Sequence, residues 1–296
     1  MRVAFIGCVN FSFQILQHLC TCQDVDLVGV VTRKESSFNS DFQNLEPLAI
    51  DAGVRCFLAQ GNDQAAMATW LRDLQPDVIY CFGWSYLLGK DILQIPRLGV
   101  VGYHPAALPK NRGRHPIIWA LALDLHETAS TFFFMDEGAD SGDILNQVTV
   151  AITSEDNAST LYGRLIDTAK SQVSIFTRQL AHNDFTRVKQ DHACKNYWRK
   201  RSKADGLIDW RMSAENIYNL VRALTKPYIG AHCIYREAEI KVWGCETLCL
   251  HGKFNNIEPG KVLDVANNRI TVKSGHDAVV LIDHELLPLP QKGDYI

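Results

Sequence analysis

Two polar loops hold the residues of this sequence that are best suited to acid–base chemistry. His104 opens a loop, 104–116, that contains three prolines and follows the apolar run LGVVGY. A second loop, 136–143 (DEGADSGD), follows the run STFFFM and carries four carboxylates. A histidine and a carboxylate held together can move protons between reacting groups near neutral pH. Each loop alone also fits a structural role, since single histidines are often structural and acidic loops are often only solvated.

The runs around these loops predict the sheet that would position them. Apolar runs at 2–6 and 77–83 alternate with segments such as 63–74, in which apolar residues recur at helical spacing. This alternation predicts an α/β fold with a Rossmann-like, mostly parallel sheet covered by helices on both faces. Ligands of such sheets bind beyond the carboxyl ends of the strands, which is where His104 stands. We expect loop 136–143 to reach the same end of the sheet if its strand neighbours that of His104.

The chain divides by pattern into three parts. Residues 1–190 hold the alternating strands and helices, end with a long helix, and are expected to form the catalytic domain. Residues 191–229 mix basic, aromatic and turn-forming residues before a short helix, which predicts a linker and helix. Residues 230–296 change to short alternating strands separated by Gly, Asn and Asp, which predicts a small antiparallel, OB-like β-barrel domain.

Composition narrows the classes of function. The formal charge of -3 and the pI near 6.4 give no overall attraction to nucleic acid or to anionic membranes, so neither is expected as a partner. The nine cysteines are an odd number without a repeating spacing, which favours reduced thiols in the cytoplasm and no metal site. No signal-peptide pattern occurs, and no apolar run reaches the roughly 18 residues of a membrane span.

Sequence motifs for common nucleotide and hydrolase chemistry are missing. Gly7 follows the first predicted strand, but the sequence there is GCVNFS rather than G-x-G-x-x-G. No P-loop and no G-x-S-x-G elbow occurs anywhere in the chain. These absences argue against dinucleotide and ATP cofactors and against an α/β-hydrolase nucleophile.

Three motifs in order give the chain a family resemblance. GWSYLL, HPAALPKNRGRHPIIWAL and DEGADSGDIL closely resemble motifs of the 10-formyltetrahydrofolate-dependent formyltransferases. The resemblance continues through GLIDW, RALTKPY and PGKVLDV, and so covers nearly the whole chain. It implies transfer of a formyl group from 10-formyltetrahydrofolate, as co-substrate, to an amine.

The resemblance also assigns the reaction centre. His104 matches the family's catalytic histidine and Asp140 matches its aspartate. The family's asparagine, two residues before the histidine, falls on Gly102, which is a departure from the pattern. In the family that amide helps to hold the formyl oxygen, and loss of one oxyanion donor costs about hundredfold in rate. Another donor, such as protonated His104, a backbone N–H or a displaced side chain, is then needed.

The resemblance places the folate against two loops. The pterin is expected near the apolar walls and main-chain groups of the first loop and in the backbone turn of the second. Without the resemblance, the apolar members of the first loop fit core packing equally well. The expected folate contacts are Ser85, Tyr86, Leu87, Leu88, Asp136, Glu137, Gly138 and Asp140.

The acceptor amine is inferred from local charge. Relatives that act on tRNA carry a Lys/Arg-rich insertion after the second strand, whereas the segment 33–44 (RKESSFNSDFQN) is nearly neutral. Arg114 is similar to the arginine of sugar N-formyltransferases, and a guanidinium suits phosphate or sugar hydroxyls. The expected substrate contacts are Asn10, Ser12, Arg114, Tyr218 and Arg222, of which the last two fit a structural role equally well.

The expected activity is therefore formylation of a nucleotide-linked amino sugar, such as a UDP- or dTDP-linked 4-amino-4,6-dideoxy sugar of a surface glycan. One alternative within the family is methionyl-tRNA formyltransferase. An alternative of another class is a catalytically silent protein that binds folate or a nucleotide sugar, which the glycine at position 102 suggests. A homodimer is a further expectation.

Overall fold

A computed structural model describes residues 1–36 and 39–296, so Ser37 and Phe38 of the segment 33–44 lie outside the described residues. The chain forms two compact units. Unit 1 comprises residues 1–116, 127–151 and 163–198, and unit 2 comprises residues 117–126, 152–162 and 199–296. The predicted domain boundaries after 190 and 229 stay a prediction. Among the described residues, no helix has the length and apolar character needed to cross a membrane.

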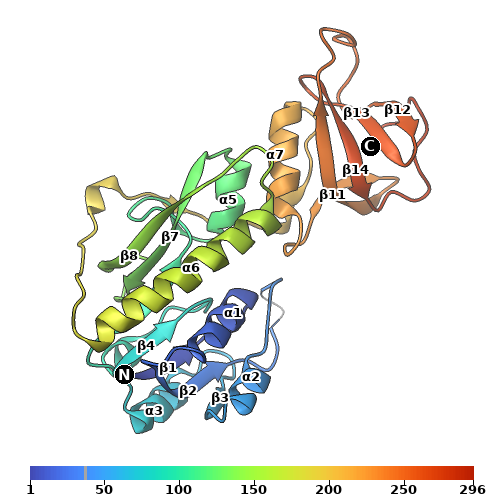
Figure 1. Ribbon diagram of the computed structural model, residues 1–296. Helices are drawn as coiled ribbons and strands as arrows, with labels where there is room; N and C mark the ends of the chain where they lie inside the picture. The colour runs from blue at the N-terminus through green and yellow to red at the C-terminus, as the bar shows by residue number, and fades with distance from the viewer. Residues whose placement is uncertain (37–38) are drawn as a thin grey trace. The chain divides into compact units, whose positions relative to one another are not determined.

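Unit 1 is built on a seven-stranded sheet with the strand order β3-β2-β1-β4-β5-β7-β8 (Figure 1). The first four neighbouring pairs are parallel, whereas β7 pairs antiparallel with both β5 and β8. The predicted mostly parallel α/β sheet is therefore confirmed. The strands are β1 (Arg2–Ile6), β2 (Asp26–Thr32), β3 (Cys56–Leu58), β4 (Val78–Cys81), β5 (Val100–His104), β7 (Glu127–Phe134) and β8 (Ile144–Ala151).

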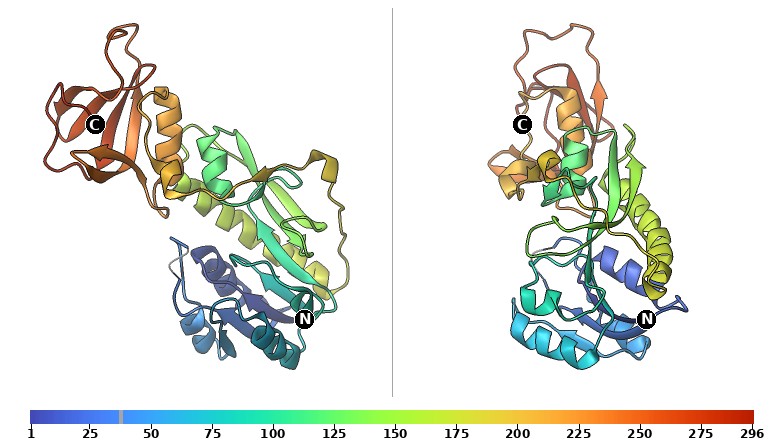
Figure 2. Two further views of the ribbon diagram at one scale, coloured as in Figure 1. Left: turned by 180° about the vertical axis from the view of Figure 1, so that it is seen from behind. Right: turned by 90° about the vertical axis from the view of Figure 1, so that its left-hand side faces the viewer.

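Helices cover both faces of this sheet because its central strands are apolar on both sides (Figure 2, right). On one face, the ring of Phe82, next to β4, makes edge contacts with Phe5 of β1 and Phe11 of α1. Phe176 of α6 packs on Tyr80 on the same face. The helices of unit 1 are α1 (Asn10–Leu19), α2 (Glu46–Asp51), α3 (Gln64–Leu74), α4 (Lys90–Leu93) and most of α6 (Ala158–Ala181).

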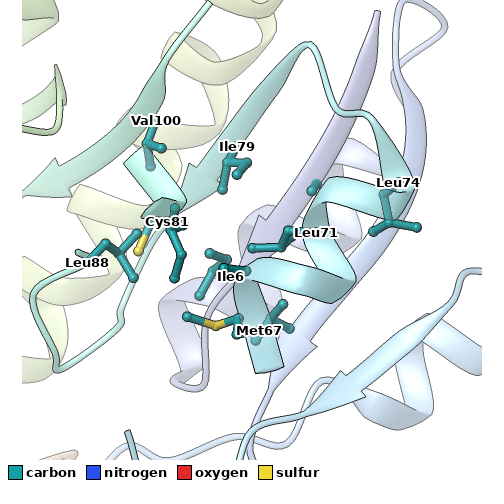
Figure 3. Close-up of a cluster of buried hydrophobic side chains, with 12 residues drawn as sticks. Ile6, Met67, Leu71, Leu74, Ile79, Cys81, Leu88 and Val100 are labelled. Atoms are coloured by element: carbon teal, nitrogen blue, oxygen red, sulfur yellow. The ribbon is translucent and has the colours of Figure 1, made fainter. Parts of the chain in front are cut away.

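The opposite face of the sheet packs on α3 and α4 (Figure 3). Alternate strand residues such as Ile6 and Ile79 point to this side, as the two-residue period of a strand requires. Met67 and Leu71 of α3 cover them and are almost completely buried. This layer supports the strands that end at the candidate site.

Unit 2 contains a five-stranded antiparallel sheet with the order β10-β11-β14-β13-β12, which confirms the predicted antiparallel β domain. Helix α7 packs against β11 and β14, so the segment before the sheet belongs to this unit. The strands are β10 (Ala231–Tyr235), β11 (Ala238–Leu248), β12 (Val262–Ala266), β13 (Arg269–Lys273) and β14 (Ala278–His284). The helices are most of α5 (Pro116–Ala122), the start of α6, η2 (Lys203–Gly206) and α7 (Ala214–Leu224).

Replacing Leu71 by Ala tests the core under the sheet. Leu71 is 0% exposed, so Leu71→Ala removes buried methyl groups and leaves a cavity against β1 and β4. We expect the free energy of unfolding to fall by about 2–5 kcal/mol. Ile175→Ala on α6, where the side chain is 55% exposed, is the control and is expected to change it by less than about 0.5 kcal/mol. Urea denaturation measures both, and equal effects would contradict the assignment of this core.

Candidate active site

His104 and Asp140 meet at the carboxyl end of β5. The imidazole of His104 is almost completely buried, and its Nδ1 lies 3.7 Å from Oδ2 of Asp140. Its Nε2 lies 2.7 Å from the carbonyl oxygen of Asn111. Both ring nitrogens thus face oxygen acceptors, and only the doubly protonated ring can donate to both. The Asp140 contact is longer than a hydrogen bond, so it leaves room to tighten when substrates bind.

Asp140 reaches His104 by a route that differs from the expected one. We expected the loops after these two strands to leave the sheet at the same end. This was wrong, because the two strands run in opposite directions. Strands β5 and β7 are neighbours but antiparallel, so β7 ends beside the start of β5, where Met135 N–H donates to the carbonyl of Val100. Loop 136–143 must therefore fold back toward His104 to deliver its carboxylate.

Hydrogen bonds from distant segments hold the returned loop. Gly113 N–H donates to Oδ2 of Asp140 at 2.9 Å. The amide of Gln190 donates to the carbonyls of Asp140, at 3.0 Å, and Gly142, at 2.6 Å. Asp140 itself has a φ of 54°, a left-handed backbone that non-glycine residues seldom adopt. The position of its carboxylate is therefore imposed by the surrounding structure.

The Gly113 N–H is placed by a short pairing between distant segments. Strand β6 (Arg112–Gly113) pairs with β9 (Tyr197–Trp198). Gly113 has a φ of 105°, and a Cβ there would lie 2.3 Å from the carbonyl oxygen of Trp198. Only glycine therefore fits this close approach.

The guanidinium of Arg112 is buried beside this pairing without a carboxylate partner among the described residues. Its Nε and Nη2 donate to Oε1 of Gln190 at 3.2 and 2.6 Å. Its Nη1 donates to the hydroxyl of Tyr197, and its Nη2 lies 3.2 Å from Nδ1 of His192. The side chain is 1% exposed, so water does not solvate the guanidinium. The neutral acceptors satisfy its N–H groups in place of water.

The space beside Gly102 is already filled. A Cβ at this position would lie 2.8 Å from Cγ of Met135 and 3.0 Å from Cζ of Phe133. Met135 follows β7 and packs against the core under the sheet. An asparagine side chain therefore does not fit at position 102 unless Met135 moves.

The loop after β4 divides the expected folate contacts into two groups. Tyr86 and Leu87 are exposed, at 36% and 57%, and are free to contact a flat heterocycle. Ser85 is half-buried and donates to the side chain of Asn39, whereas Leu88 is 3% exposed and belongs to the core under the sheet. A role in packing therefore suits Leu88 better than a direct contact.

The turn at the start of the second loop is organised by its own first residue. Oδ1 of Asp136 accepts hydrogen bonds from Gly138 N–H at 3.0 Å and from the hydroxyl of Ser141 at 2.6 Å. Glu137 and Gly138 are exposed. Asp136 thus shapes the turn, and its neighbours present their backbone to solvent.

Arg33 and Trp84 lie beside the expected folate contact Tyr86, and neither was anticipated from the sequence. The guanidinium of Arg33 lies 4.7 Å from the ring centroid of Tyr86 and 5.2 Å from that of Trp84. Nε1 of Trp84 is buried and has no hydrogen-bond partner within the described parts of the chain. Their positions after β2 and β4, at the carboxyl ends of parallel strands, were the signal that could have identified them.

Two family models together match most of the chain. Residues 1–177 match the model described as formyl transferase, and residues 200–288 match that of the formyl transferase C-terminal domain. The chain belongs to the formyl transferase family. It is 30% identical over 288 residues to a methionyl-tRNA formyltransferase of Caldanaerobacter subterraneus subsp. tengcongensis, covering 96% of this chain and 91% of that relative.

Solved structures of formyltransferases share the fold. The N-formyltransferase from Helicobacter canadensis in complex with folinic acid and dTDP-3-aminofucose superposes with a TM-score of 0.71 at 15% identity, covering 96% of this chain and 99% of that one. A 4-N formyltransferase from Francisella tularensis gives a TM-score of 0.66 at 18% identity, covering 80% and 94%. At these identities the likeness concerns the fold alone.

Within this formyl transferase, the expected substrate residues of unit 1 differ in accessibility. Asn10 is half-buried at the start of α1, beyond the carboxyl end of β1. Arg114 is half-buried, and its Nη1 donates to the carbonyl of Ser85 at 3.3 Å. Ser12 is completely buried, with its hydroxyl bonded to the Phe82 carbonyl and to Val9 N–H, so it fixes a loop and has no surface for a ligand.

The two expected substrate residues on α7 of this formyl transferase serve unit 2 internally. Arg222 is 5% exposed and donates to Asp124 and to the carbonyls of Thr153 and Asp156. Tyr218 donates to the carbonyl of Ser154. These contacts favour the structural role that the sequence left open for both residues.

Restoring the family asparagine tests the crowding at position 102. Gly102→Asn pushes the new side chain against Met135 and Phe133, and we expect it to lower the free energy of unfolding by about 1–3 kcal/mol. Met135→Ala should relieve the clash, so the double variant Gly102→Asn/Met135→Ala should lose less than the sum of the two single variants. Thermal unfolding of all four proteins measures the coupling. Additive losses would show that Met135 does not fill this space.

Proposed function

We propose that this formyl transferase moves the formyl group of 10-formyltetrahydrofolate to an amine, with His104 and Asp140 at the reaction centre. The observation that carries the proposal is the 3.7 Å approach of His104 Nδ1 to Asp140 Oδ2 beyond the carboxyl end of β5. The exposed Tyr86 and Leu87 on the loop after β4 offer apolar surface to the pterin. The folinic acid bound to the structurally similar Helicobacter canadensis N-formyltransferase supports the choice of donor.

In the first step, the neutral amine attacks the formyl carbon and the carbonyl oxygen gains negative charge. The N–H of His104 Nε2, which donates to the Asn111 carbonyl in the free protein, turns to this oxygen. Asp140 stabilises the positive charge of the ring through Nδ1. His104 thereby supplies the oxyanion donor that Gly102 lacks.

In the second step, the tetrahedral intermediate collapses and the bond from carbon to folate nitrogen breaks. The attacking nitrogen loses one proton and the leaving nitrogen gains one, so no net proton is consumed. Asp140 can accept the first proton through a water molecule, and His104 can give one to the leaving nitrogen. Passage of the proton from Asp140 to His104, 3.7 Å away, then restores both groups. The products are the N-formylated acceptor and tetrahydrofolate.

For the acceptor we propose a nucleotide-linked amino sugar, such as a UDP- or dTDP-linked 4-amino-4,6-dideoxy sugar. Arg114 supports this choice, because its guanidinium lies beside the loop after β4 and suits a phosphate or sugar hydroxyls. Asn10 provides a further half-buried amide beyond the end of β1. The sugar nucleotide bound to the similar Helicobacter canadensis enzyme agrees with an acceptor of this class.

Methionyl-tRNA is the second candidate acceptor. The sequence relatives at 29–30% identity are methionyl-tRNA formyltransferases, and they support this candidate more directly than the sugar. Against it, the described part of segment 33–44 is not a basic surface. Its Asp41 carbonyl accepts from Asn10 N–H, and its Phe42 bridges to Val9, which brings an acidic residue to the end of β1.

Removal of the reaction-centre side chains tests the mechanism. His104→Ala and Asp140→Ala should each lower kcat by about 100-fold or more, since each removes a group that moves or stabilises a proton. His182→Ala and Asp184→Ala, at exposed positions of the same unit, are controls and should retain kcat. Release of tetrahydrofolate gives the rate, and thermal unfolding confirms the fold. Near-normal kcat in either reaction-centre variant would remove that residue from the mechanism.

The acceptor is tested by offering the full chain UDP- and dTDP-linked 4-amino sugars beside methionyl initiator tRNA. We expect turnover with a sugar nucleotide, and Arg114→Ala should raise its KM by about tenfold, with Arg114→Lys intermediate. Turnover with methionyl-tRNA alone would establish the second candidate. Binding of folate without turnover of any acceptor would instead support the catalytically silent protein.

A further inference from the structure

The side chain of Gln190 contacts the loop that carries Asp140, and both the oxygen and the nitrogen of its amide form hydrogen bonds. Oε1 accepts from Nε and Nη2 of Arg112, at 3.2 and 2.6 Å. Nε2 donates to the carbonyls of Asp140 and Gly142, at 3.0 and 2.6 Å. A guanidinium can only donate and a carbonyl can only accept, so these partners fix the orientation of the amide.

Asp140 needs external support to keep its position. Its φ of 54° lies in the left-handed region, which is disfavoured for a residue with a side chain. The carboxylate receives one bond from Gly113 N–H, but the backbone of the loop is held by the two bonds from Gln190. Without them the loop is free to relax toward ordinary backbone angles, which would move Oδ2 away from His104.

Arg112 is what keeps Gln190 in place. The guanidinium is 1% exposed, and its other acceptors are the hydroxyl of Tyr197 and Nδ1 of His192. Rotation of the Gln190 amide would leave two N–H groups of a buried charge without an acceptor, which is costly. The buried guanidinium of Arg112 thus restricts the Gln190 amide to one orientation.

We propose that Gln190 is a positioning residue that holds Asp140 against His104 by tying the backbone of Asp140 and Gly142 to the buried guanidinium of Arg112. The proposal rests on the proposed function, in which Asp140 assists His104. It assigns to Gln190 an effect on the rate of formyl transfer and little effect on folate binding.

Gln190→Glu is the central test, because it keeps the shape and the acceptor oxygen but replaces the N–H donors by a charged oxygen. The new carboxylate still accepts from Arg112, but it cannot donate to the carbonyls of Asp140 and Gly142. We expect an unchanged or higher melting temperature, a kcat lower by about 10- to 100-fold, and a KM for 10-formyltetrahydrofolate within about threefold of the original. A purely structural residue would keep kcat in this variant, because Arg112 remains paired.

Gln172→Glu is the matched control. Gln172 on α6 is also buried, at 2% exposed against 6% for Gln190, and its Nε2 also donates to a backbone carbonyl, that of Ser130, at 3.0 Å. The same chemical change there should lower the melting temperature but leave kcat within about twofold, since no contact with Asp140 is lost. A comparable fall of kcat in Gln172→Glu would overturn the proposal by showing a general response to a buried carboxylate.

Gln190→Met provides a second variant in case the glutamate perturbs folding. It removes both kinds of hydrogen bond, and equilibrium binding of folate counts the folded sites, so kcat can be expressed per competent site. We expect the same loss of kcat per site. Full kcat in both Gln190 variants, while His104→Ala and Asp140→Ala are inactive, would overturn the positioning role alone. Activity in the His104 and Asp140 variants would instead overturn the proposed function.

Discussion

The antiparallel pairing of β5 with β7 is the constraint on which the proposed reaction centre depends. In a fully parallel sheet, successive loops emerge together at the carboxyl ends of the strands. Here β7 ends beside the start of β5, and its loop must double back before Asp140 comes within 3.7 Å of His104. Asp136 shapes the start of this return through hydrogen bonds inside the loop, whereas the part that carries Asp140 is held by hydrogen bonds from Gly113 and Gln190.

The segments that supply these hydrogen bonds are linked to one another through the buried guanidinium of Arg112. Strand β6 pairs with β9, which aligns Gly113 N–H with the Asp140 carboxylate, while Arg112 of the same strand holds Gln190 against the loop backbone. Burial of a guanidinium without partners is unfavourable. Loss of one of its hydrogen bonds therefore costs more free energy than formation of that bond gains. That asymmetry makes the arrangement stiff, because each partial rearrangement leaves part of a full charge unsatisfied. A stiff frame suits a site whose reacting groups must stay within fractions of an ångström.

The sequence predicts what depends on local pattern and misses what depends on long-range contact. Alternating apolar runs identified the sheet and the antiparallel second domain, because burial imposes its period on each element. The direction of β7 was missed, since a buried strand looks the same in either direction. Gln190 carried no signal, as its partner Arg112 is 78 positions away in the chain. Burial of Ser12 was equally hidden, whereas the sequence left a structural role open for Leu88 and Arg222. The places of His104 and loop 136–143 after strands suggested chemistry, and the resemblance to a family then assigned the roles of His104 and Asp140.

In the proposed mechanism, Gly102 and Met135 change the role that His104 must take. With Met135 filling the space beside Gly102, a side-chain amide has no room to hold the formyl oxygen there. In the mechanism that we propose, Nε2 of His104 holds the formyl oxygen instead, and in the free protein it donates to the carbonyl of Asn111 at 2.7 Å. Exchange of one oxygen acceptor for another requires little reorganisation, and the carbonyl that is released can accept from water. The developing oxyanion is the stronger acceptor of the two, so the exchange favours the transition state over the ground state, which is the condition for catalysis.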